Sequence, residues 1–380
     1  MPFPGVSVNV DTGNLLRALP NLDSVPALAV TVATEGLQGV VTTVFSLKDA
    51  ENKGITSTSE AFLHYILTEF YTELGGNKKL YIMGFADTVL MSKMLDVTDE
   101  AAVYKMIKDA NGEITHIGVC RNPDTGDVPG DAFLNADVAL ALTAGKSLAA
   151  NFQAKNQPVR LLIEGQVNDD EVANSLDLSA LSNGYCGIVL GSTKADGSAS
   201  VGLALARIVK YPAHVKIGDG QNGSLTAGQL YIGADKIEDR PDVEDLHDQG
   251  FITFHRRPGV AGYFFGVDNM CTDDDTSILV HGNVLDKAQR ISAATYTPYI
   301  ESNIRINDDG TINETDAKQL ENQLKTQILA NMEGQISNVD VIIDTTQNIV
   351  DNSTLQVKVK ILPLGYLTWI EVTLGFTTSI

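Results

Sequence analysis

The sequence predicts an α/β fold, α+β overall: a layered α/β central domain, and a smaller C-terminal domain of helices and a β-hairpin, with extended N- and C-terminal arms. From about residue 25 to 270, short apolar runs alternate with segments of helical period. The end of the chain instead alternates apolar and polar residues, as β-strands do. A chain of 380 residues also exceeds what one core usually holds, which favours two domains. We place an N-terminal arm, expected to pair with the C-terminal domain or with a neighbour, at 1–24, the α/β domain at 25–275 and the C-terminal domain at 276–380.

The central domain is predicted from short apolar strands and the helices between them. The expected strands are Ala27–Ala33, Leu80–Met83, Ile114–Cys120, Val159–Ile163 and Cys186–Leu190. The expected helices are Ser59–Leu74, Asp99–Asp109, Asn135–Asn156 and Ser200–Val209. In the first helix Phe62, Ile66 and Phe70 recur at four-residue steps, and an acidic cap is expected to open the second. The alternation indicates a doubly wound sheet.

Beyond residue 210 the character of the sequence changes. Residues 210–282 are dense in Gly, Asp and short aromatic runs, which predicts loops and strands rather than long helices. Helices are then expected at Val284–Asn303, interrupted or bent near Pro298, and at Glu314–Gln335, with Asn313 as its N-cap. Two polar segments at the joins, Asp11–Asp23 and Asp273–Gly282, are expected to be hinges.

The tail of the chain reads as β-structure. Strands are predicted at Asp340–Asp344, Leu355–Leu362 and Leu367–Phe376, with a turn at Pro363–Gly365 joining the last two. A two-stranded terminal hairpin is marginal alone, and its unpaired edges invite another strand. We therefore expect a further strand to pair with it.

Composition limits the function classes. The net charge is -21 and the pI is near 4.5, which argues against nucleic acid or an anionic membrane as the main partner. With neither a signal peptide nor a run of about 18 apolar residues, the protein is expected to be made and kept in the cytoplasm. Cys120, Cys186 and Cys271 form no C-x-x-C pair, so neither a disulfide framework nor a zinc site is predicted.

Two segments superficially resemble phosphate-binding loops. Ala144–Ser147 ends like a P-loop, but Leu140 stands where that motif needs its first Gly. Gly191–Gly197 follows a strand and precedes a helix, yet it lacks the G-x-G-x-x-G spacing. A surface turn explains the second segment better, and no cofactor is predicted.

Metal and catalytic motifs also fail. Asp273–Asp275 could hold a cation, although solvated acidic turns are commoner. An EF-hand alignment over Arg305–Asp316 puts Arg305 in the first ligand position, which excludes it. The six His residues (64, 116, 214, 247, 255 and 281) make no H-E-x-x-H cluster, and no G-x-S-x-G elbow occurs. No catalytic or metal-binding residue is predicted, and an α/β nucleotide- or sugar-handling enzyme remains the alternative of a different class.

Three regions resemble the sheath proteins of contractile phage tails. The first is Phe3–Val6, followed by the alternating Ser7–Val10 and an apolar strand. The second, and the most specific, is Phe70–Gly76 running into Lys79–Ile82. The third comprises Asp286–Arg290, Tyr299–Glu301 and the final β pair ending Gly375–Phe376. The likeness covers about half of the chain, and it is nearest to a compact sheath-like family of phages and prophages of Bacteroidota and related injection systems. The chain has little room for the outer domains of larger sheaths.

The resemblance implies a structural subunit and no enzyme. Such a subunit would assemble helically around a tail tube and contract to drive the tube through a cell envelope. Its partners would be its own copies, the tube, baseplate and tail terminator proteins, with no nucleic acid and no stable insertion into a membrane. It would lie in the virion tail after synthesis in the host bacterial cytoplasm. The sheath of a non-viral contractile injection system is the close alternative.

The resemblance also implies site residues. Sheath subunits exchange terminal strands with their neighbours by β-augmentation. The residues expected to take part are Val6, Val8, Val10, Leu367, Trp369, Glu371, Thr373 and Phe376. The helix Glu314–Gln335, with Lys318 and Lys325, is expected to face the tube.

Overall fold

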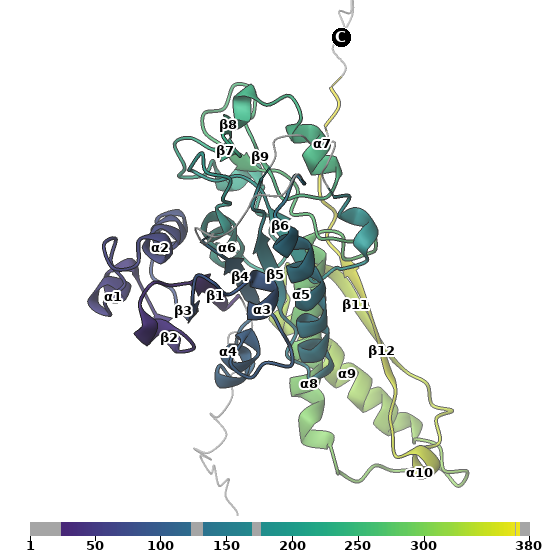
Figure 1. The fold of residues 1–380 in the computed structure, drawn as a ribbon. Coiled ribbons are helices and arrows are strands. Elements are labelled where there is room, and N and C mark those ends of the chain that lie inside the picture. The colour runs from purple at the N-terminus through teal and green to yellow at the C-terminus, as the bar shows by residue number, and fades with distance from the viewer. Residues whose placement is uncertain (1–23, 123–131, 169–175, 369, 373–380) are drawn as a thin grey trace, which may run out of the picture. The chain divides into compact units, whose positions relative to one another are not determined.

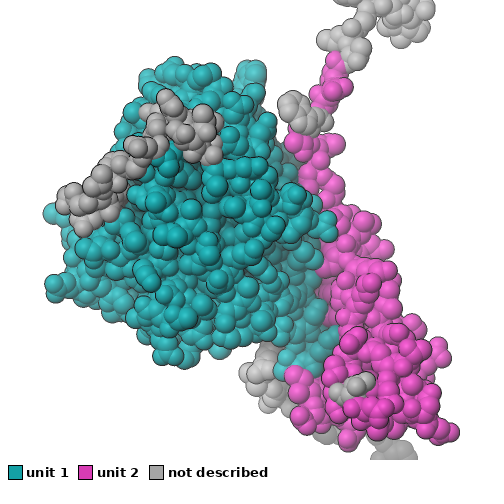
Figure 2. Space-filling model, turned by 45° about the vertical axis from the view of Figure 1, so that its right-hand side comes forward, with its two compact units in different colours: residues 1–298 teal, residues 299–380 magenta. Residues whose placement is uncertain are grey.

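A computed structural model describes residues 24–122, 132–168, 176–368 and 370–372. The chain divides into two compact units, Met1–Pro298 and Tyr299–Ile380, which Figure 2 shows in teal and magenta. The boundary expected near residue 275 stays a prediction. The division between the two compact units lies after Pro298, so the long helix Leu279–Tyr296 belongs to unit 1.

Unit 1 is built on one six-stranded sheet, with strand order β2-β3-β1-β4-β5-β6 (Figure 1). The strands are β1 (Pro26–Thr31), β2 (Val41–Val44), β3 (Leu80–Phe85), β4 (His116–Cys120), β5 (Arg160–Glu164) and β6 (Cys186–Val189). All pairs are parallel except β2 with β3. The first described strand, β1, lies in the middle of the sheet, and the later strands add to it on both sides, so the doubly wound prediction is confirmed. The five parallel strands are the five that the sequence predicts.

Helices cover both faces of this sheet. The α-helices of unit 1 are α1 (Leu47–Asn52), α2 (Ala61–Leu74), α3 (Met91–Met94), α4 (Val103–Asp109), α5 (Ala136–Ala154), α6 (Val201–Lys210), α7 (Val243–Asp248) and α8 (Leu279–Tyr296). A Cβ on Gly118 of β4 would touch Val201 of α6, whereas Gly145 of α5 lies over Leu161 of β5. Leu161 pairs with Ile117, the neighbour of Gly118. Because adjacent strand residues point to opposite faces, α5 and α6 lie on opposite sides.

Short elements complete unit 1. Two hairpins, β7 (Tyr231–Ile232) with β8 (Asp235–Lys236) and β9 (Phe254–His255) with β10 (Phe264–Phe265), lie within residues 210–282, where loops and strands are predicted. The 3-10 helices among the described residues are η1 (Glu35–Leu37), η3 (Ser179–Leu181), η4 (Gly220–Asn222), η5 (Ile237–Asp239) and η6 (Thr297–Tyr299).

The predicted starts of α4 and α8 and the predicted end of α8 are wrong. Helix α4 begins after Ala102 without a side-chain cap, because the Asp99 carboxylate accepts from the amide of Ala101 in a separate turn. Helix α8 begins five residues before Val284 and ends at Tyr296. The expected interruption near Pro298 is confirmed, because α8 ends at Tyr296 and Pro298 lies in η6, beyond its end.

Unit 2 pairs one long helix with a two-stranded sheet. Its elements are α9 (Glu314–Asn331), β11 (Ile336–Ile343), α10 (Ile349–Asn352) and β12 (Val357–Pro363). The side chain of Asn313 accepts from the amide of Thr315 at 3.0 Å, which confirms the predicted cap of α9. Helix α9 packs on β11. Its apolar stripe and the inward side chains of β11 are buried, namely Leu320, Leu324, Ile328, Val339, Val341 and Ile343.

The predicted pairing of the last two strands is not found among the described residues, and Trp369 and residues 373–376 of the second strand lie outside them. Strand β12 pairs antiparallel with β11, with Val359 opposite Val341, and Pro363 is its last residue rather than part of a turn. Leu367, Thr368 and residues 370–372 form no strand. Alternation assigns each residue to one face of a strand but does not name the neighbouring strand.

Candidate functional site

The carboxyl edge of the parallel sheet is where an α/β enzyme would bind its ligand. Here side-chain carboxylates of the protein itself accept hydrogen bonds from backbone amides at that edge. After β1, the amides of Ala33 and Thr34 donate to the Glu60 carboxylate at 3.0 and 2.6 Å. Glu60 is buried, so these two donors are already satisfied inside the fold.

Glu164, the last residue of β5, likewise accepts a hydrogen bond from a backbone amide just after the neighbouring strand β4. It accepts from the amide of Arg121 at 2.8 Å and from that of Ala199, just before α6, at 3.2 Å. Burial raises the pKa of Glu164 to about 7. Amides that could cradle a phosphate in other doubly wound proteins are thus engaged by side chains of the chain itself.

A third buried carboxylate, that of Glu69, lies near the start of α6. Glu69 of α2 accepts from the hydroxyls of Tyr65, Thr193 and Ser200 at 2.6 to 2.8 Å, and burial raises its pKa. Thr193 belongs to the glycine-containing segment Gly191–Gly197. That segment therefore ties α2 to the sheet.

The other segments that resemble phosphate-binding or metal-binding motifs have structural explanations. Ala144–Ser147 lies inside α5. Asp274 accepts from the amide and hydroxyl of Thr276 in a turn before α8. Arg305 forms an ion pair with Asp316. Among the described residues, no group of three His, Cys, Asp or Glu side chains could hold a metal ion, and all three cysteines are buried as free thiols.

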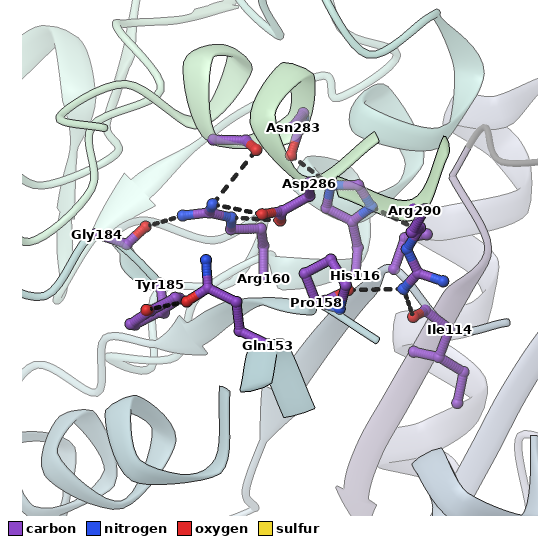
Figure 3. Close-up of polar contacts among 12 residues, drawn as sticks. Ile114, His116, Gln153, Pro158, Arg160, Gly184, Tyr185, Asn283, Asp286 and Arg290 are labelled. Carbon is purple, nitrogen blue, oxygen red and sulfur yellow. Dashed lines mark hydrogen bonds and ion pairs between the residues drawn. The ribbon is translucent and has the colours of Figure 1, made fainter. Parts of the chain in front are cut away.

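A buried polar cluster fastens α8 to the amino ends of β4 and β5 (Figure 3); we call it the α8 joint. Arg160 donates to both oxygens of Asp286 at 2.7 Å and to the carbonyl of Gly282 at 3.3 Å. Asp286 is 8% exposed and Arg160 3%. The guanidinium and the carboxylate satisfy each other where water cannot.

Two further residues of α8 extend the joint. Asn283 bonds Nε2 of His116 at 2.9 Å, and burial lowers the pKa of His116 to about 4, so the ring is neutral near pH 7. Arg290 donates to the carbonyls of Ile114 at 2.8 Å and Pro158 at 2.6 Å (Figure 3). The α8 joint contains a small cavity lined in part by His116, Asn283 and Arg290.

Sequence reasoning missed the α8 joint. Its partners are 126 and 167 residues apart for Arg160 with Asp286 and for His116 with Asn283. The available signal was the placement of polar residues at the starts of two apolar strands, together with the resemblance noted at Asp286–Arg290. Only the fold brings them together.

The surface of unit 2 is unusual in its apolar content. Although unit 2 is the smaller unit, it contributes most of the exposed large apolar side chains among the described residues. The most exposed range from 48% for Ile306 to 88% for Leu367, and also include Ile300, Val350, Leu362, Ile370 and Val372.

The edge of β12 is a second feature of unit 2. In the described part of the chain β12 pairs with β11 alone, and no other strand joins that sheet. Val357, Val359 and Ile361 stay half-buried, whereas the facing Val339, Val341 and Ile343 are buried. Helix α9 therefore shelters β11 better than β12.

The predicted site residues are only partly visible. Val6, Val8, Val10, Trp369, Thr373 and Phe376 lie outside the described residues. Leu367 and Glu371 are exposed. On α9, Lys318 pairs with Glu321 at 2.7 Å and Lys325 with Asp340 at 3.6 Å, so both lysines are tied to unit 2 at its surface.

Comparison with known proteins gives two family matches. The model described as DUF2586, N-terminal domain, matches residues 3–269, and that described as DUF2586, C-terminal domain, matches 281–380. No curated protein matches the sequence. Within the described residues, no helix is long and apolar enough to cross a membrane.

Solved structures share the fold at low sequence identity. The helical sheath of the anti-feeding prophage in the contracted state has a TM-score of 0.62 and 14% identity, covering 100% of both chains. The sheath complex of PVC, an extracellular contractile injection system, in the contracted state has a TM-score of 0.60 and 14% identity, covering 100% of this chain and 98% of that one. The sheath tail protein from Desulfitobacterium hafniense gives 0.51 and 12%, over 95% and 100%.

Proposed function

Because this chain belongs to the DUF2586 family and has the fold of contractile sheath proteins, we propose that it is a structural subunit of a contractile sheath. The subunit assembles helically around a tail tube and contracts to drive that tube through a cell envelope. The observation that carries the proposal is in unit 2, whose described residues include many exposed apolar side chains and a sheet in which β12 pairs with β11 alone.

Strand addition to β12 is the contact that this surface fits. The half-buried Val357, Val359 and Ile361 alternate with the exposed Lys358 and Lys360. A strand beside β12 would continue this pattern, with apolar residues on the α9 side and polar residues facing the lysines. The sequence from Val6 to Asp11 has this alternation, with Val6, Val8 and Val10 on one face. We therefore propose that the amino-terminal arm of a neighbouring copy adds to β12 by β-augmentation.

The carboxyl-terminal arm is the second linker. Its even-numbered residues Ile370, Val372, Leu374 and Phe376 are apolar, so they suit a strand with one buried face. Distinct arms at the two ends provide the heterologous contacts that an open helical array needs. The arms keep neighbouring subunits connected while the subunits rotate during contraction.

The carboxyl edge of the sheet supports a role without catalysis. Glu60 and Glu164 occupy the amides that a nucleotide phosphate would use. Removing those carboxylates from buried amides would leave the donors unsatisfied, which is unfavourable. The nucleotide- or sugar-handling enzyme is thus the weaker candidate.

The partners follow from the proposed role. They are further copies of this chain, a tail tube protein, and the baseplate and tail terminator proteins at the two ends of the sheath. The face of α9 with Lys318 and Lys325 is proposed to lie toward the tube. A virion tail and a non-viral injection system make the same demands on this subunit. Neighbouring genes for a capsid and a terminase would identify a phage.

Negative-stain microscopy of the purified protein tests the proposal. We expect hollow helical tubes at high protein concentration, and folded single subunits after deletion of Leu367–Ile380. A protein that stays monomeric at high concentration and is strongly stabilised by a nucleotide in a thermal-shift assay would instead support the enzyme. Tubes that form unchanged after the deletion would remove the carboxyl-terminal arm from the proposal.

A further inference from the structure

Helix α8 is fastened to unit 1 along its length. The α8 joint holds it through Asp286 and Asn283, and Arg290 holds it one turn further on. Gln289 adds a hydrogen bond to the carbonyl of Gln153 at 2.7 Å. The helix also buries an apolar stripe that includes Val284, Ala288 and Ile291.

The segment just before α8 is held as well. The amide of Leu279 donates to the carbonyl of Asp268 at 2.8 Å, and that of Met270 to the carbonyl of Ser277 at 2.8 Å. The amide of Cys271 donates to the carbonyl of Cys186 in β6 at 2.9 Å. These bonds close the loop on itself and attach it to the sheet, although Asp273–Gly282 is a segment expected to be a hinge.

The segment after α8 is different. Every residue from 297 to 303 is exposed. Beyond the single turn of η6, Ser302 bonds back to the carbonyl of Tyr299, and the Tyr299 hydroxyl donates to Gln323 of α9, a contact within unit 2. Glu301 has a φ of 63°, in the left-handed region that non-glycine residues seldom adopt. Little burial therefore opposes a change in these backbone angles.

We propose that α8 moves with unit 1 as one body and that residues 297–303 are the swivel on which unit 2 turns. A few exposed residues at the end of an element can absorb a large change in backbone angles, as hinges do. The swivel lets unit 2 keep its strand contacts with neighbours while unit 1 is reoriented. That use rests on the proposed function, whereas the swivel itself is a property of the single subunit.

Distances between spin labels on the free subunit test the swivel. The three native cysteines are buried, so labels go to introduced cysteines at exposed positions. Ala150→Cys on α5 pairs with Ala294→Cys near the end of α8, and separately with Ala330→Cys on α9. Position 294 follows the expected hinge at 273–282 and precedes the proposed swivel, so the two pairs separate the two segments. Ala330→Cys with Lys360→Cys on β12 reports on unit 2 alone.

We expect a narrow distribution of distances between labels at positions 150 and 294, which both lie in unit 1. We expect a broad distribution between positions 150 and 330, which lie in different units. The distribution between positions 330 and 360, both in unit 2, should again be narrow. Broad distributions for both pairs that include 150 would move the flexible segment upstream of α8 and overturn the proposal. Narrow distributions for all three pairs would also overturn it, because the units would then be rigidly joined. A broad distribution for 330 with 360 would place the motion inside unit 2 and overturn it as well. None of these readings depends on whether the protein forms tubes.

Discussion

The carboxylate of Asp286 receives two hydrogen bonds of 2.7 Å from the guanidinium of Arg160, and both side chains are buried. One residue lies in α8 and the other begins β5, so this ion pair joins the last helix of unit 1 to its sheet. Burying the two charges removes their favourable hydration. Their mutual attraction offsets this loss only while both charges are present.

Removing one partner of the ion pair should therefore strongly destabilise the folded protein. We expect Asp286→Asn to lower the free energy of unfolding by about 3–5 kcal/mol, because Arg160 would keep a buried charge without its counterion. Urea denaturation of the full chain measures this change. Asp275→Asn, at an exposed position, is the control and should change the stability by less than about 0.5 kcal/mol. Equal effects of the two substitutions would contradict the structural role of the ion pair.

Glu164 should make stability depend on pH in the opposite sense to a salt-bridged carboxylate. Its pKa is about 7 in the folded protein against 4.5 for an ordinary glutamate. Between these values the unfolded chain releases a proton that the folded protein keeps, so its contribution to stability is full below pH 4.5 and is lost as the pH rises through 7.

Replacing this carboxyl group should flatten that dependence. We expect Glu164→Gln to reduce the fall in unfolding free energy between about pH 5 and about pH 8 relative to the unmodified protein, as measured by denaturation across that range. Glu35→Gln, on the surface, is the control and should leave the slope unchanged. An unchanged slope in Glu164→Gln would mean that Glu164 has an ordinary pKa in the folded state.

The contact between α2 and α6 requires a glycine. A Cβ on Gly202 would stand 2.7 Å from the backbone oxygen of Ile66, which cannot move aside as a flexible side chain could. We expect Gly202→Ala to destabilise the protein by about 1–3 kcal/mol through this overpacking. Gly36→Ala is the matched control, because nothing lies within 4 Å of the added methyl group. Thermal denaturation compares the two, and similar midpoints would show that the helices separate at little cost.

The amino-terminal arm gives a test of strand addition with a built-in control. Val8→Asp places a charge on the apolar face of the alternating segment, whereas Asn9→Asp places the same charge on its polar face. We expect Val8→Asp to abolish helical tubes in negative stain and to leave a folded subunit by circular dichroism. Asn9→Asp should assemble normally. Equal assembly by both variants would exclude a one-sided strand at Val6–Val10.

The elements with strong local signals could be predicted from the sequence. The five parallel strands are continuous apolar runs because both of their faces are buried, and α9 is recognisable from its spacing and its Asn313 cap. The resemblance to sheath proteins, based on short motifs at the two ends and before Lys79–Ile82, is confirmed at the level of the fold. The assignment to Bacteroidota stays a prediction.

What the sequence by itself determined was which segments form strands and helices, because periodicity and capping act over a few residues. Only the tertiary structure decided which distant segments meet. Strand β12 could have paired with Leu367–Phe376, which is close in the chain, but it lies against β11, whose inward side chains are covered by α9. Arg160 is a charged residue next to an apolar run, and Asp286 lies in a helical segment with other charged residues. Their pairing across 126 residues depends on the packing of α8 against the sheet, which no local pattern encodes.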